Sequence, residues 1–377
     1  MHVTHDAPLA PLTTLGLGGP AATLVELTDP ADFTEFAESM AAEGGCPPAT
    51  LGAGSNTLVH DSGCSTPVLR MATRGIRPLG RADEERVLVE VEAGHSLADL
   101  VGTTIAEGLT GMEMLTGIPG TVGAMPVQNV GAYGQETSGI LVAVRAWDWH
   151  GRRRVTLSAA ECGLGHRTSR FKGSGRWTLL SLVFALRRSA LGAPIEYRQV
   201  AAELGVDLGA RVPPAEAARA VHAVRRGKGM VLECAPRGER SVGSVFLSPE
   251  ISPARAAELR TRDAPVNRFP DGSTRVSASW LIREAGFDLG RSIVAGVRVS
   301  SLHYTLVVEE PAGSATAAGF AAAVDIVRRR VHRHTGVRLT AEIDFLGDWD
   351  REPRENGVTR SPRAVSNGDA RNLKLKS

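Results

Sequence analysis

Cysteine is scarce in this sequence of 377 residues, and the cysteines that occur form no recognisable pattern. Cys46, Cys64, Cys162 and Cys234 include no Cys-x-x-Cys pair and no spacing typical of a zinc finger. A disulfide-rich secreted protein and a cysteine-based zinc site are therefore excluded, and no metal is expected. We expect free thiols in a reducing compartment.

The sequence also lacks an excess of charge of one sign and a long apolar run. Lysine and arginine total 43, aspartate and glutamate total 41, and the net charge is +2. This balance gives no reason to expect nucleic acid as a partner. The opening MHVTHDAPLAPLTTLGLGG lacks the basic start and apolar core of a signal peptide, and no apolar run is long enough to span a membrane. We expect a cytoplasmic protein without a membrane partner.

Glycine is plentiful while aromatic residues are few. The chain has 42 glycines, and aromatic residues make up 5% of it. Such a composition is typical of tight turns and of backbone that approaches a nucleotide cofactor closely. Hydrophobic residues make up 42%, which is enough for compact cores, and the length predicts two or three domains.

The first region of the chain is predicted to be a small α/β unit. Short strands are expected over 22–27, 49–51 and 67–72. A helix is expected over 30–43, and it begins after Asp29, a good N-cap.

The middle region, from about residue 73, combines strands with a long glycine-rich stretch over 111–139. The predicted strands are 86–93, 142–149, 153–157 and 177–186, of which the second and third form a hairpin that turns at His150-Gly151. The predicted helices are 96–107, with Ser96 as N-cap and Gly108 at its C-terminal end, and 213–225.

A third region runs from about residue 227 to 338. Its predicted helices are 276–285, led by Ser277 or Ser279, and 316–335, whose basic second half suits the helix dipole. An apolar strand is expected over 301–309 and a last strand over 338–346. Residues 348–377 are polar and aperiodic, and we expect them to form a disordered tail.

Two glycine-rich motifs indicate where a phosphate-bearing cofactor binds. The first, LGAGSNTLV (Leu51–Val59), ends a strand in small residues whose backbone N–H groups can approach phosphate oxygens. It is neither a G-x-G-x-x-G fingerprint nor a Walker loop, and taken alone an ordinary glycine turn explains it equally well. The second, GIPGTVGAMPVQNVGAYGQE (Gly117–Glu136), is too long for a simple connection and offers many N–H donors.

Together these motifs resemble the UDP-N-acetylenolpyruvoylglucosamine reductase family, also called UDP-N-acetylmuramate dehydrogenase, in its longer-loop subtype. The segments GHRTSRFKG, KGMVL, GSVF and RVSASWLIREAGF follow in that family's order, so the resemblance covers roughly residues 13–347. The Pro-Val-Gln-Asn-x-Gly-Ala-Tyr-Gly continuation is its most specific part.

The resemblance implies an α+β fold made of a two-part FAD-binding fold of the vanillyl-alcohol-oxidase-like (PCMH-type) class and a separate α+β substrate-binding domain. The implied limits are 1–76 for the first FAD-binding subdomain, joined by the strand 337–347, 77–226 for the second, and 227–336 for the substrate-binding domain.

The implied ligands are non-covalent FAD, NADPH and a UDP-sugar substrate, bound by a protein expected to be a monomer. The cofactor-binding residues implied are Gly52, Ala53, Gly54, Ser55, Asn56, Thr57, Gly117, Pro119, Gly120, Gly123, Gln128, Asn129, Gly131, Ala132, Tyr133 and Gly134. Tyr197 and Lys228 match substrate-binding positions, although both could be surface residues. His303 matches a family histidine and is expected to be structural.

Arg167, Ser244 and Glu342 match the family's catalytic positions. The resemblance implies that FAD takes hydride from NADPH and passes it to the vinyl carbon of the enolpyruvyl group. Arg167 and a protonated Glu342 then stabilise charge on the substrate carboxylate, and Ser244 protonates the neighbouring carbon. Without the family, these residues would be a basic turn, a turn serine and, with Asp344 on the same strand face, a solvent-facing acidic pair.

Two departures from the family pattern leave other functions open. His166 stands where tyrosine is common, and Leu247-Ser248 lack the usual asparagine after the Gly-Ser-x-Phe motif. A paralogue that reduces another enolpyruvyl or enol substrate is therefore one alternative. A flavin-binding module without catalysis is another, but the intact Arg167, Ser244 and Glu342 argue against it.

Overall fold

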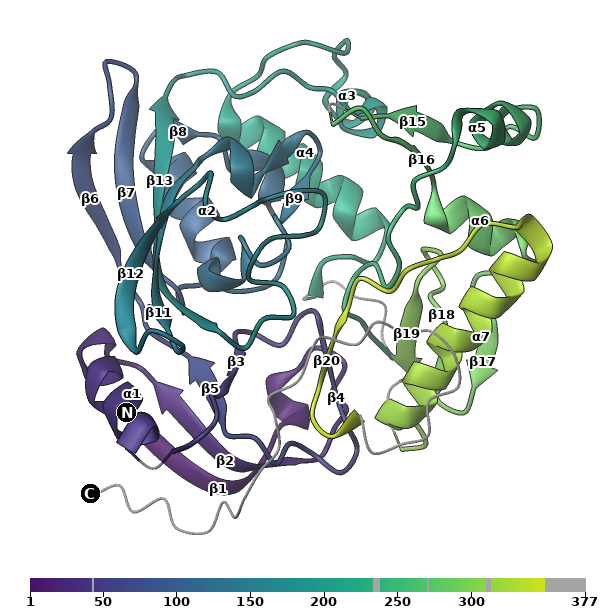
Figure 1. Ribbon diagram of the computed structural model, residues 1–377. Helices are drawn as coiled ribbons and strands as arrows, with labels where there is room; N and C mark the ends of the chain where they lie inside the picture. The colour runs from purple at the N-terminus through teal and green to yellow at the C-terminus, as the bar shows by residue number, and fades with distance from the viewer. Residues whose placement is uncertain (43, 233–237, 270, 310–312, 350–377) are drawn as a thin grey trace.

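The structure is a computed structural model, and it describes residues 1–42, 44–232, 238–269, 271–309 and 313–349. Its strands form three main sheets, of which two belong to the N-terminal and middle regions and one to the C-terminal region (Figure 1). Within the described ranges, no helix has the length and apolarity needed to cross a membrane. The same residues contain no cluster of three or more His, Cys, Asp or Glu side chains suited to a metal ion.

The first sheet confirms the predicted α/β unit and adds a strand to it. Its order is β1 (His2–Pro8), β2 (Pro20–Leu27), β5 (Val68–Met71), β3 (Ala49–Leu51). Strands β2, β5 and β3 are parallel, and β1, which no sequence signal predicted, pairs antiparallel with β2. A 3-10 turn (Pro30–Asp32) leads into α1 (Phe33–Ala42), and the Asp29 carboxylate caps it by accepting the Ala31 N–H at 2.9 Å.

The second sheet is antiparallel; it contains the four predicted strands and two short ones that were not predicted. Its order is β12 (Arg153–Ser158), β11 (Leu141–Asp148), β13 (Trp177–Arg188), β7 (Arg86–Glu92), β6 (Ile76–Arg81), and β8 (Leu109–Thr110) pairs with β13. Its helices are α2 (Leu97–Ala106), α3 (Arg198–Leu204) and α4 (Pro214–Gly227). The Ser96 hydroxyl caps α2 by accepting the Asp99 N–H, as predicted. The glycine-rich stretch contains only short elements: β9 (Gly131–Ala132), β10 (Gln135–Glu136) and the 3-10 turns Glu113–Leu115, Val122–Ala124 and Thr137–Gly139.

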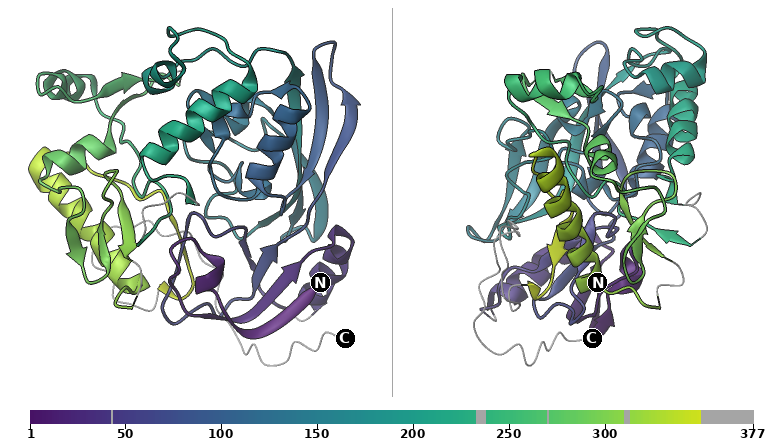
Figure 2. Two further views of the ribbon diagram at one scale, coloured as in Figure 1. Left: turned by 180° about the vertical axis from the view of Figure 1, so that it is seen from behind. Right: turned by 90° about the vertical axis from the view of Figure 1, so that its right-hand side faces the viewer.

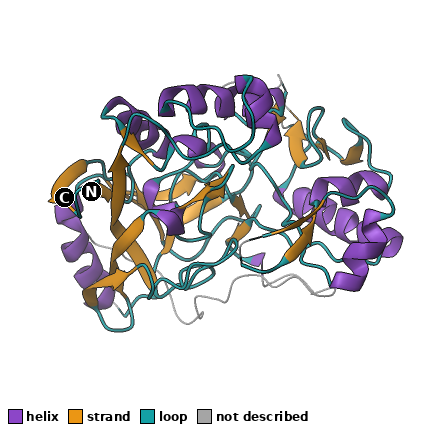
Figure 3. Cartoon of the chain, turned by 90° about the horizontal axis from the view of Figure 1, so that it is seen from above, coloured by secondary structure: helices purple, strands orange, loops and turns teal. Residues whose placement is uncertain are grey.

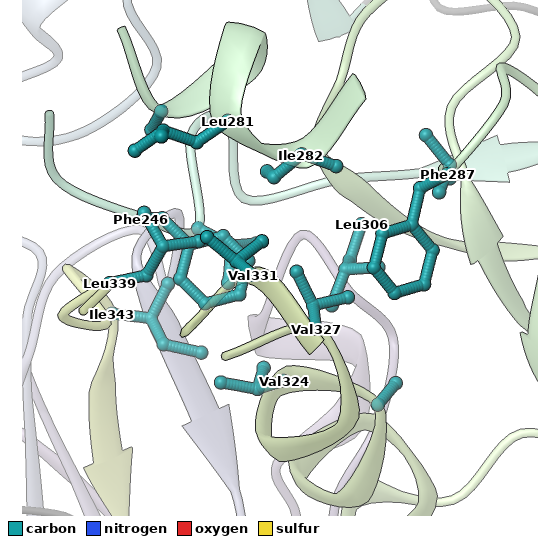
Figure 4. Packing of buried hydrophobic residues seen from close by; sticks show 14 of the residues in the cluster. Phe246, Leu281, Ile282, Phe287, Leu306, Val324, Val327, Val331, Leu339 and Ile343 are labelled. Carbon is teal, nitrogen blue, oxygen red and sulfur yellow. The ribbon is translucent and has the colours of Figure 1, made fainter. Parts of the chain in front are cut away.

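The C-terminal region forms a core of its own, to which Leu15, Leu17 and Leu58 of the N-terminal region also contribute. Its sheet has the order β14 (Glu239–Arg240), β19 (Leu306–Glu309), β18 (Val297–Val299), β17 (Ser292–Val294), beside the hairpin β15 (Val266–Arg268) and β16 (Thr274–Val276). Its helices are α5 (Pro253–Arg260), α6 (Ala278–Glu284) and α7 (Ala317–Thr335). Figure 4 shows Val324, Val327 and Val331 of α7 packed with Phe246 and Leu306 in this core.

The predicted helices of this region are confirmed, while the strand predicted over 301–309 is correct only for its second half. Ser277 caps α6 and Thr316 caps α7. Residues 301–305 form a turn before β19, so His303 does not lie inside a strand as expected. The left view of Figure 2, seen from behind, shows that this region stands apart from the second sheet, and Figure 3 shows long loops in the part of the molecule between them.

The last strand pairs with a strand of the N-terminal region, and it is shorter than predicted. β20 (Asp344–Leu346) pairs in parallel with β4 (Thr57–Val59), while Ala341 forms an isolated bridge with Phe246. The chain therefore leaves the C-terminal core and enters the N-terminal region within a few residues (Figure 1).

The prediction that the tail begins at Asp348 is wrong for its first two residues. Trp349 is buried in the C-terminal core, and its ring lies edge-on to His60 at 4.7 Å between centroids. The Asp348 carboxylate accepts a hydrogen bond from Ser65 at 2.9 Å. A single tryptophan in a polar segment gives no periodicity, so the sequence pattern could not reveal this contact. The remainder of the predicted tail, 350–377, lies outside the described residues.

Candidate active site

One large cavity lies between the glycine-rich loops and the C-terminal region, with a volume of about 1770 Å³. Small-ligand sites usually measure about 300–1,000 Å³, so this one has room for a dinucleotide and a second ligand. The three predicted catalytic residues, Arg167, Ser244 and Glu342, all line it. The predicted cofactor-binding residues that line it are Gly52, Ala53, Gly54, Ser55, Asn56, Thr57, Pro119, Gly120, Gly123, Gln128, Gly131 and Ala132.

The loops around this cavity fit a nucleotide cofactor because they have no room for side chains. Gly54 has φ +60°, and a Cβ atom there would lie 2.2 Å from the Leu12 carbonyl oxygen. A Cβ at Gly123 would lie 2.8 Å from the Cβ of Ala93. The Ser55 hydroxyl donates to the Pro119 carbonyl at 3.2 Å and so ties the two loops together. Much of this part of the wall is therefore backbone and small side chains, which suits the pyrophosphate of FAD.

Gly117, Asn129, Tyr133 and Gly134 were also predicted to bind the cofactor, but they are not among the residues that line the cavity. Asn129 is buried, its amide donates to the Gly165 carbonyl at 3.1 Å, and its side-chain oxygen accepts the Ser138 N–H at 2.9 Å. In this structure its side chain fastens the glycine-rich loop to the GHRTSRFKG segment.

Arg167 and Glu342 form the central pair of the cavity. The Arg167 Nε lies 3.3 Å from the Glu342 Oε1, and its Nη1 and Nη2 donate to the carbonyls of Asn129 at 3.0 Å and Gly131 at 2.6 Å. Arg167 has φ +51°, an uncommon backbone conformation for a side chain of this size. Burial raises the pKa of Glu342, while the positive charges of Arg167 and Lys172 oppose that rise. The pair can thus offer a fixed cation and a carboxyl group that tends to hold a proton.

Hydrogen bonds from Asn56 and Lys172 hold the backbone of Glu342 against the two glycine-rich loops. The Asn56 amide donates to the Glu342 carbonyl at 3.3 Å and to the Gln128 side-chain oxygen at 3.1 Å. The Lys172 ammonium donates to the same two oxygens, at 3.0 and 3.4 Å. Asn56, Gln128 and Lys172 come from three separate motifs, so this junction unites them with the last strand.

Sequence reasoning gave no role to Lys172 or Asp344, although both belong to this site. Asp344 lines the cavity, and its Oδ2 lies 3.5 Å from the Asn56 amide nitrogen. Burial raises the pKa of Asp344, and Lys172 and Asn56 oppose the rise. Asp344 is two residues after Glu342, and Lys172 lies in the GHRTSRFKG motif with Arg167, so both were near assigned residues. Their partial burial and their hydrogen bonds distinguish them from exposed charges.

Ser244 reaches the cavity from the C-terminal region. Its side chain is exposed, whereas its neighbours Val242 and Val245 are buried. The Glu342 N–H donates to the Val245 carbonyl at 2.8 Å, which brings the serine segment alongside the last strand. The two residues thus enter one cavity although nearly a hundred positions separate them in the chain.

Tyr197 and Lys228 form a cluster with Tyr133 and are not among the residues that line the cavity. The rings of Tyr197 and Tyr133 meet edge-on at 5.4 Å between centroids, and the Lys228 nitrogen lies 6.0 Å from the Tyr133 centroid. The Lys228 ammonium donates to the Gln199 side-chain oxygen at 2.5 Å. Burial and the nearby Arg225 lower the pKa of Lys228. Arg225, which sequence reasoning did not single out, lines the cavity.

The two histidines singled out from the sequence also lie off the cavity wall. His166 packs against Phe269 at 6.2 Å between ring centroids. Burial and then the charge of Arg275 lower its pKa to about 4, so it is neutral at neutral pH. Burial likewise lowers the pKa of His303 to about 4.

Comparisons with known proteins agree with this geometry. Residues 21–156 match a family model described as an FAD binding domain, and residues 235–346 match one described as the C-terminal domain of UDP-N-acetylenolpyruvoylglucosamine reductase. The chain is similar to the reductases of that name from Thermobifida fusca (40% identity over 91% of this chain and 98% of the relative) and Salinispora arenicola (38% over 91% and 95%). The crystal structure of UDP-N-acetylenolpyruvylglucosamine reductase from Thermus caldophilus shares the fold, with a TM-score of 0.60 and 24% identity over 92% of this chain and 98% of that one.

Proposed function

The chain belongs to the UDP-N-acetylenolpyruvoylglucosamine reductase family, and we propose that Arg167, Ser244 and Glu342 carry out the chemistry of that enzyme here. The protein is an FAD-dependent oxidoreductase that uses NADPH to reduce UDP-N-acetylenolpyruvoylglucosamine to UDP-N-acetylmuramate, a step of peptidoglycan precursor synthesis. Its α+β fold combines an FAD-binding domain with the family's C-terminal domain, as the sequence motifs imply. The observation that carries our proposal is that the three side chains line one cavity together with both glycine-rich loops.

The glycine loops hold the cofactor, and the remaining chemistry belongs to side chains. FAD, when bound, accepts hydride from NADPH and supplies it to the vinyl carbon of the substrate. Asn129, Gly131 and Glu342 engage three of the five guanidinium N–H groups of Arg167 in this structure. Two N–H groups are thus left to bind the enolpyruvyl carboxylate, on which negative charge builds as hydride arrives.

Glu342 and Ser244 complete the reaction from the facing wall. Because burial raises its pKa, the Glu342 carboxyl can keep its proton and donate a hydrogen bond to the charged substrate carboxylate. Ser244 then gives its hydroxyl proton to the carbon next to that carboxylate. The substrate gains one hydride and one proton, and the serine recovers its proton from water.

The alternative of a paralogue with another enol substrate loses its motive in this structure. It was based on His166 and on Leu247-Ser248, and these residues are not among those that line the cavity. The Leu247 N–H donates to the Thr340 carbonyl at 3.0 Å, so this residue supports the last strand. Neither departure from the family pattern is therefore among the residues that line the cavity.

An anaerobic reoxidation experiment tests the function. The flavin is reduced with one equivalent of NADPH without oxygen, UDP-N-acetylenolpyruvoylglucosamine is added, and the return of oxidised flavin absorbance is followed. UDP-N-acetylglucosamine, which lacks the enolpyruvyl group, is the control. We expect rapid reoxidation with the first compound and none with the second. Reduced flavin that stays reduced in both would contradict the function.

The expected cytoplasmic location and monomeric state are part of the proposal. Light scattering of the flavin-loaded protein tests the monomeric state, and a dimer at micromolar concentration would contradict it.

A further inference from the structure

The side-chain hydroxyl of Thr305 forms hydrogen bonds on both sides of Ser244, the proposed catalytic serine. This oxygen accepts the Val245 N–H at 3.3 Å and donates to the Gly243 carbonyl at 2.8 Å, so it binds the residues directly before and after Ser244. Thr305 is buried, whereas the Ser244 side chain is exposed to the cavity. We propose that Thr305 is a positioning residue that fixes Ser244 for proton transfer, and this inference rests on the role proposed above for Ser244.

Only a hydroxyl can make both of these bonds from one atom. A hydroxyl oxygen donates and accepts at once, while a methyl group of the same size does neither. Gly243 has φ +74° and its Cβ position faces open space, and the Ser241 hydroxyl accepts the Gly243 N–H at 2.9 Å. Thr305, in contrast, also holds Val245, so it restrains the backbone on both sides of Ser244.

Thr305 is itself well fixed. Its N–H donates to the His303 carbonyl at 2.8 Å, and its own carbonyl accepts the Ser300 N–H at 2.9 Å. It directly precedes β19, the strand between β14 and β18. As a β-branched residue it has few side-chain rotamers, which favours a single placement of the hydroxyl.

The same segment also controls the spacing between Ser244 and Glu342. Val245 donates its N–H to the Thr305 hydroxyl, and its carbonyl accepts the Glu342 N–H. If the Thr305 hydroxyl is lost, the peptide group between Ser244 and Val245 can rotate, and the serine moves relative to the carboxyl group that faces the substrate. A displacement of about 1 Å can cost on the order of 100-fold in rate.

Hydrogen bonding of Thr305 is tested with three single variants. Thr305→Val keeps the shape and removes both bonds, Thr305→Ser keeps both, and Thr305→Cys keeps the volume with a weaker donor and acceptor. We expect Thr305→Val to slow substrate-driven flavin reoxidation by about 10- to 100-fold while flavin reduction by NADPH changes less than about twofold. Thr305→Ser should stay within about threefold of the unaltered protein, with Thr305→Cys between the two.

A double variant shows whether Thr305 acts through Ser244. Adding Thr305→Val to Ser244→Ala should slow reoxidation no further, because the group that Thr305 positions is already gone. The solvent deuterium isotope effect on reoxidation should rise in Thr305→Val alone, because a misplaced acid makes proton transfer slower. A further loss in the double variant, or equal loss in both half-reactions, would overturn the inference.

Failure of this inference is distinguishable from failure of the proposed function. If Ser244→Ala slows reoxidation but Thr305→Val does not, only the role of Thr305 is wrong. If Ser244→Ala reoxidises at the normal rate, the assignment of Ser244 as acid is wrong, and the inference about Thr305 falls with it. If Thr305→Val does not fold, loss of reoxidation in Thr305→Cys with normal NADPH reduction supports the inference, and normal reoxidation in Thr305→Cys overturns it.

Discussion

The two walls of the cavity are built in opposite ways. The wall from residues 51–57 and 119–132 is rich in glycine and small side chains, although Met125 and Gln128 also line it, and a Cβ atom added at Gly54 or Gly123 would collide with neighbouring residues. The facing wall, from the C-terminal region and the last strand, presents functional side chains, Ser244 and Glu342, held by hydrogen bonds.

This difference shows that binding and catalysis depend on different kinds of information. The requirement for glycine in a loop is local, because it is set by the backbone conformation and close contacts at that one position. A catalytic wall needs distant segments in register, because Ser244 and Glu342 are brought together by backbone contacts between residues 245–247 and 340–342. The two walls should therefore respond differently to substitution, and the following changes test that difference.

The largest effect is expected on the catalytic wall, from Ser244→Ala. Flavin reoxidation by the enolpyruvyl substrate should slow by about 100- to 10,000-fold, because general acid catalysis is lost. Reduction by NADPH should hardly change, because no proton donor is needed in that step. Ser244→Cys should retain more activity than the alanine variant, since a thiol can still donate. Stopped-flow measurement of both half-reactions checks this. Equal loss in both would show that Ser244 serves the flavin wall or the fold.

The second prediction concerns Trp349, which packs between the N-terminal region and the C-terminal core. A chain ending at Gly347 should lose about 3 kcal/mol in free energy of unfolding relative to one ending at Trp349, as for removal of a buried tryptophan. The reason is that Trp349 packs on His60 and Phe345 and donates to the Leu346 carbonyl at 3.0 Å. Urea unfolding of the two chains gives the difference. Equal stabilities would mean that the contacts of Trp349 add nothing to the pairing of β20 with β4.

Gly54→Ala tests the flavin wall. Alanine at φ +60° costs about 1–2 kcal/mol in backbone strain, and its Cβ would displace the Leu12 carbonyl. FAD affinity should fall about 10-fold or more, since that strain deforms a loop lining the cavity. Gly102→Ala is the matched control, because Gly102 lies within α2 with open space around it. That change should stabilise the protein by about 0.5–1 kcal/mol and leave flavin binding unchanged. Equal flavin affinity in both variants would contradict a wall that depends on missing side chains.

The smallest expected effect is the pH dependence that Glu342 imposes on the catalytic wall. Its folded pKa is raised by burial, so the protonated form persists above the ordinary carboxyl range and is lost as pH rises through the folded pKa. The folded state binds more protons than the unfolded state in this window, so this contribution to stability also falls as pH rises. Glu342→Gln should remove this alkaline limb from both the reoxidation rate and the unfolding free energy. A limb that persists in Glu342→Gln would assign it to another group, Asp344 being the first to examine.

The sequence by itself determined the regular elements and the family. Caps such as Asp29, Ser96 and Ser277 and the apolar periodicity act over a few residues, so α1, α2 and α6 could be predicted from local rules. The two glycine-rich motifs likewise indicated the cofactor loops, because a backbone conformation that favours glycine is visible in the sequence as a glycine at that position.

Only the tertiary structure decided which charged and polar residues belong to the site. Lys172, Asp344 and Thr305 have ordinary sequence surroundings, and their roles arise from burial and from partners far along the chain. Conversely, Asn129 was expected at the cofactor, but its amide hydrogen bonds are used within the protein. Hydrogen bonds and desolvation depend on distances in space, whereas a sequence pattern records spacing along the chain. The glycine-rich loops could therefore be recognised from the sequence. The hydrogen-bond network that positions the catalytic groups could not be recognised in this way.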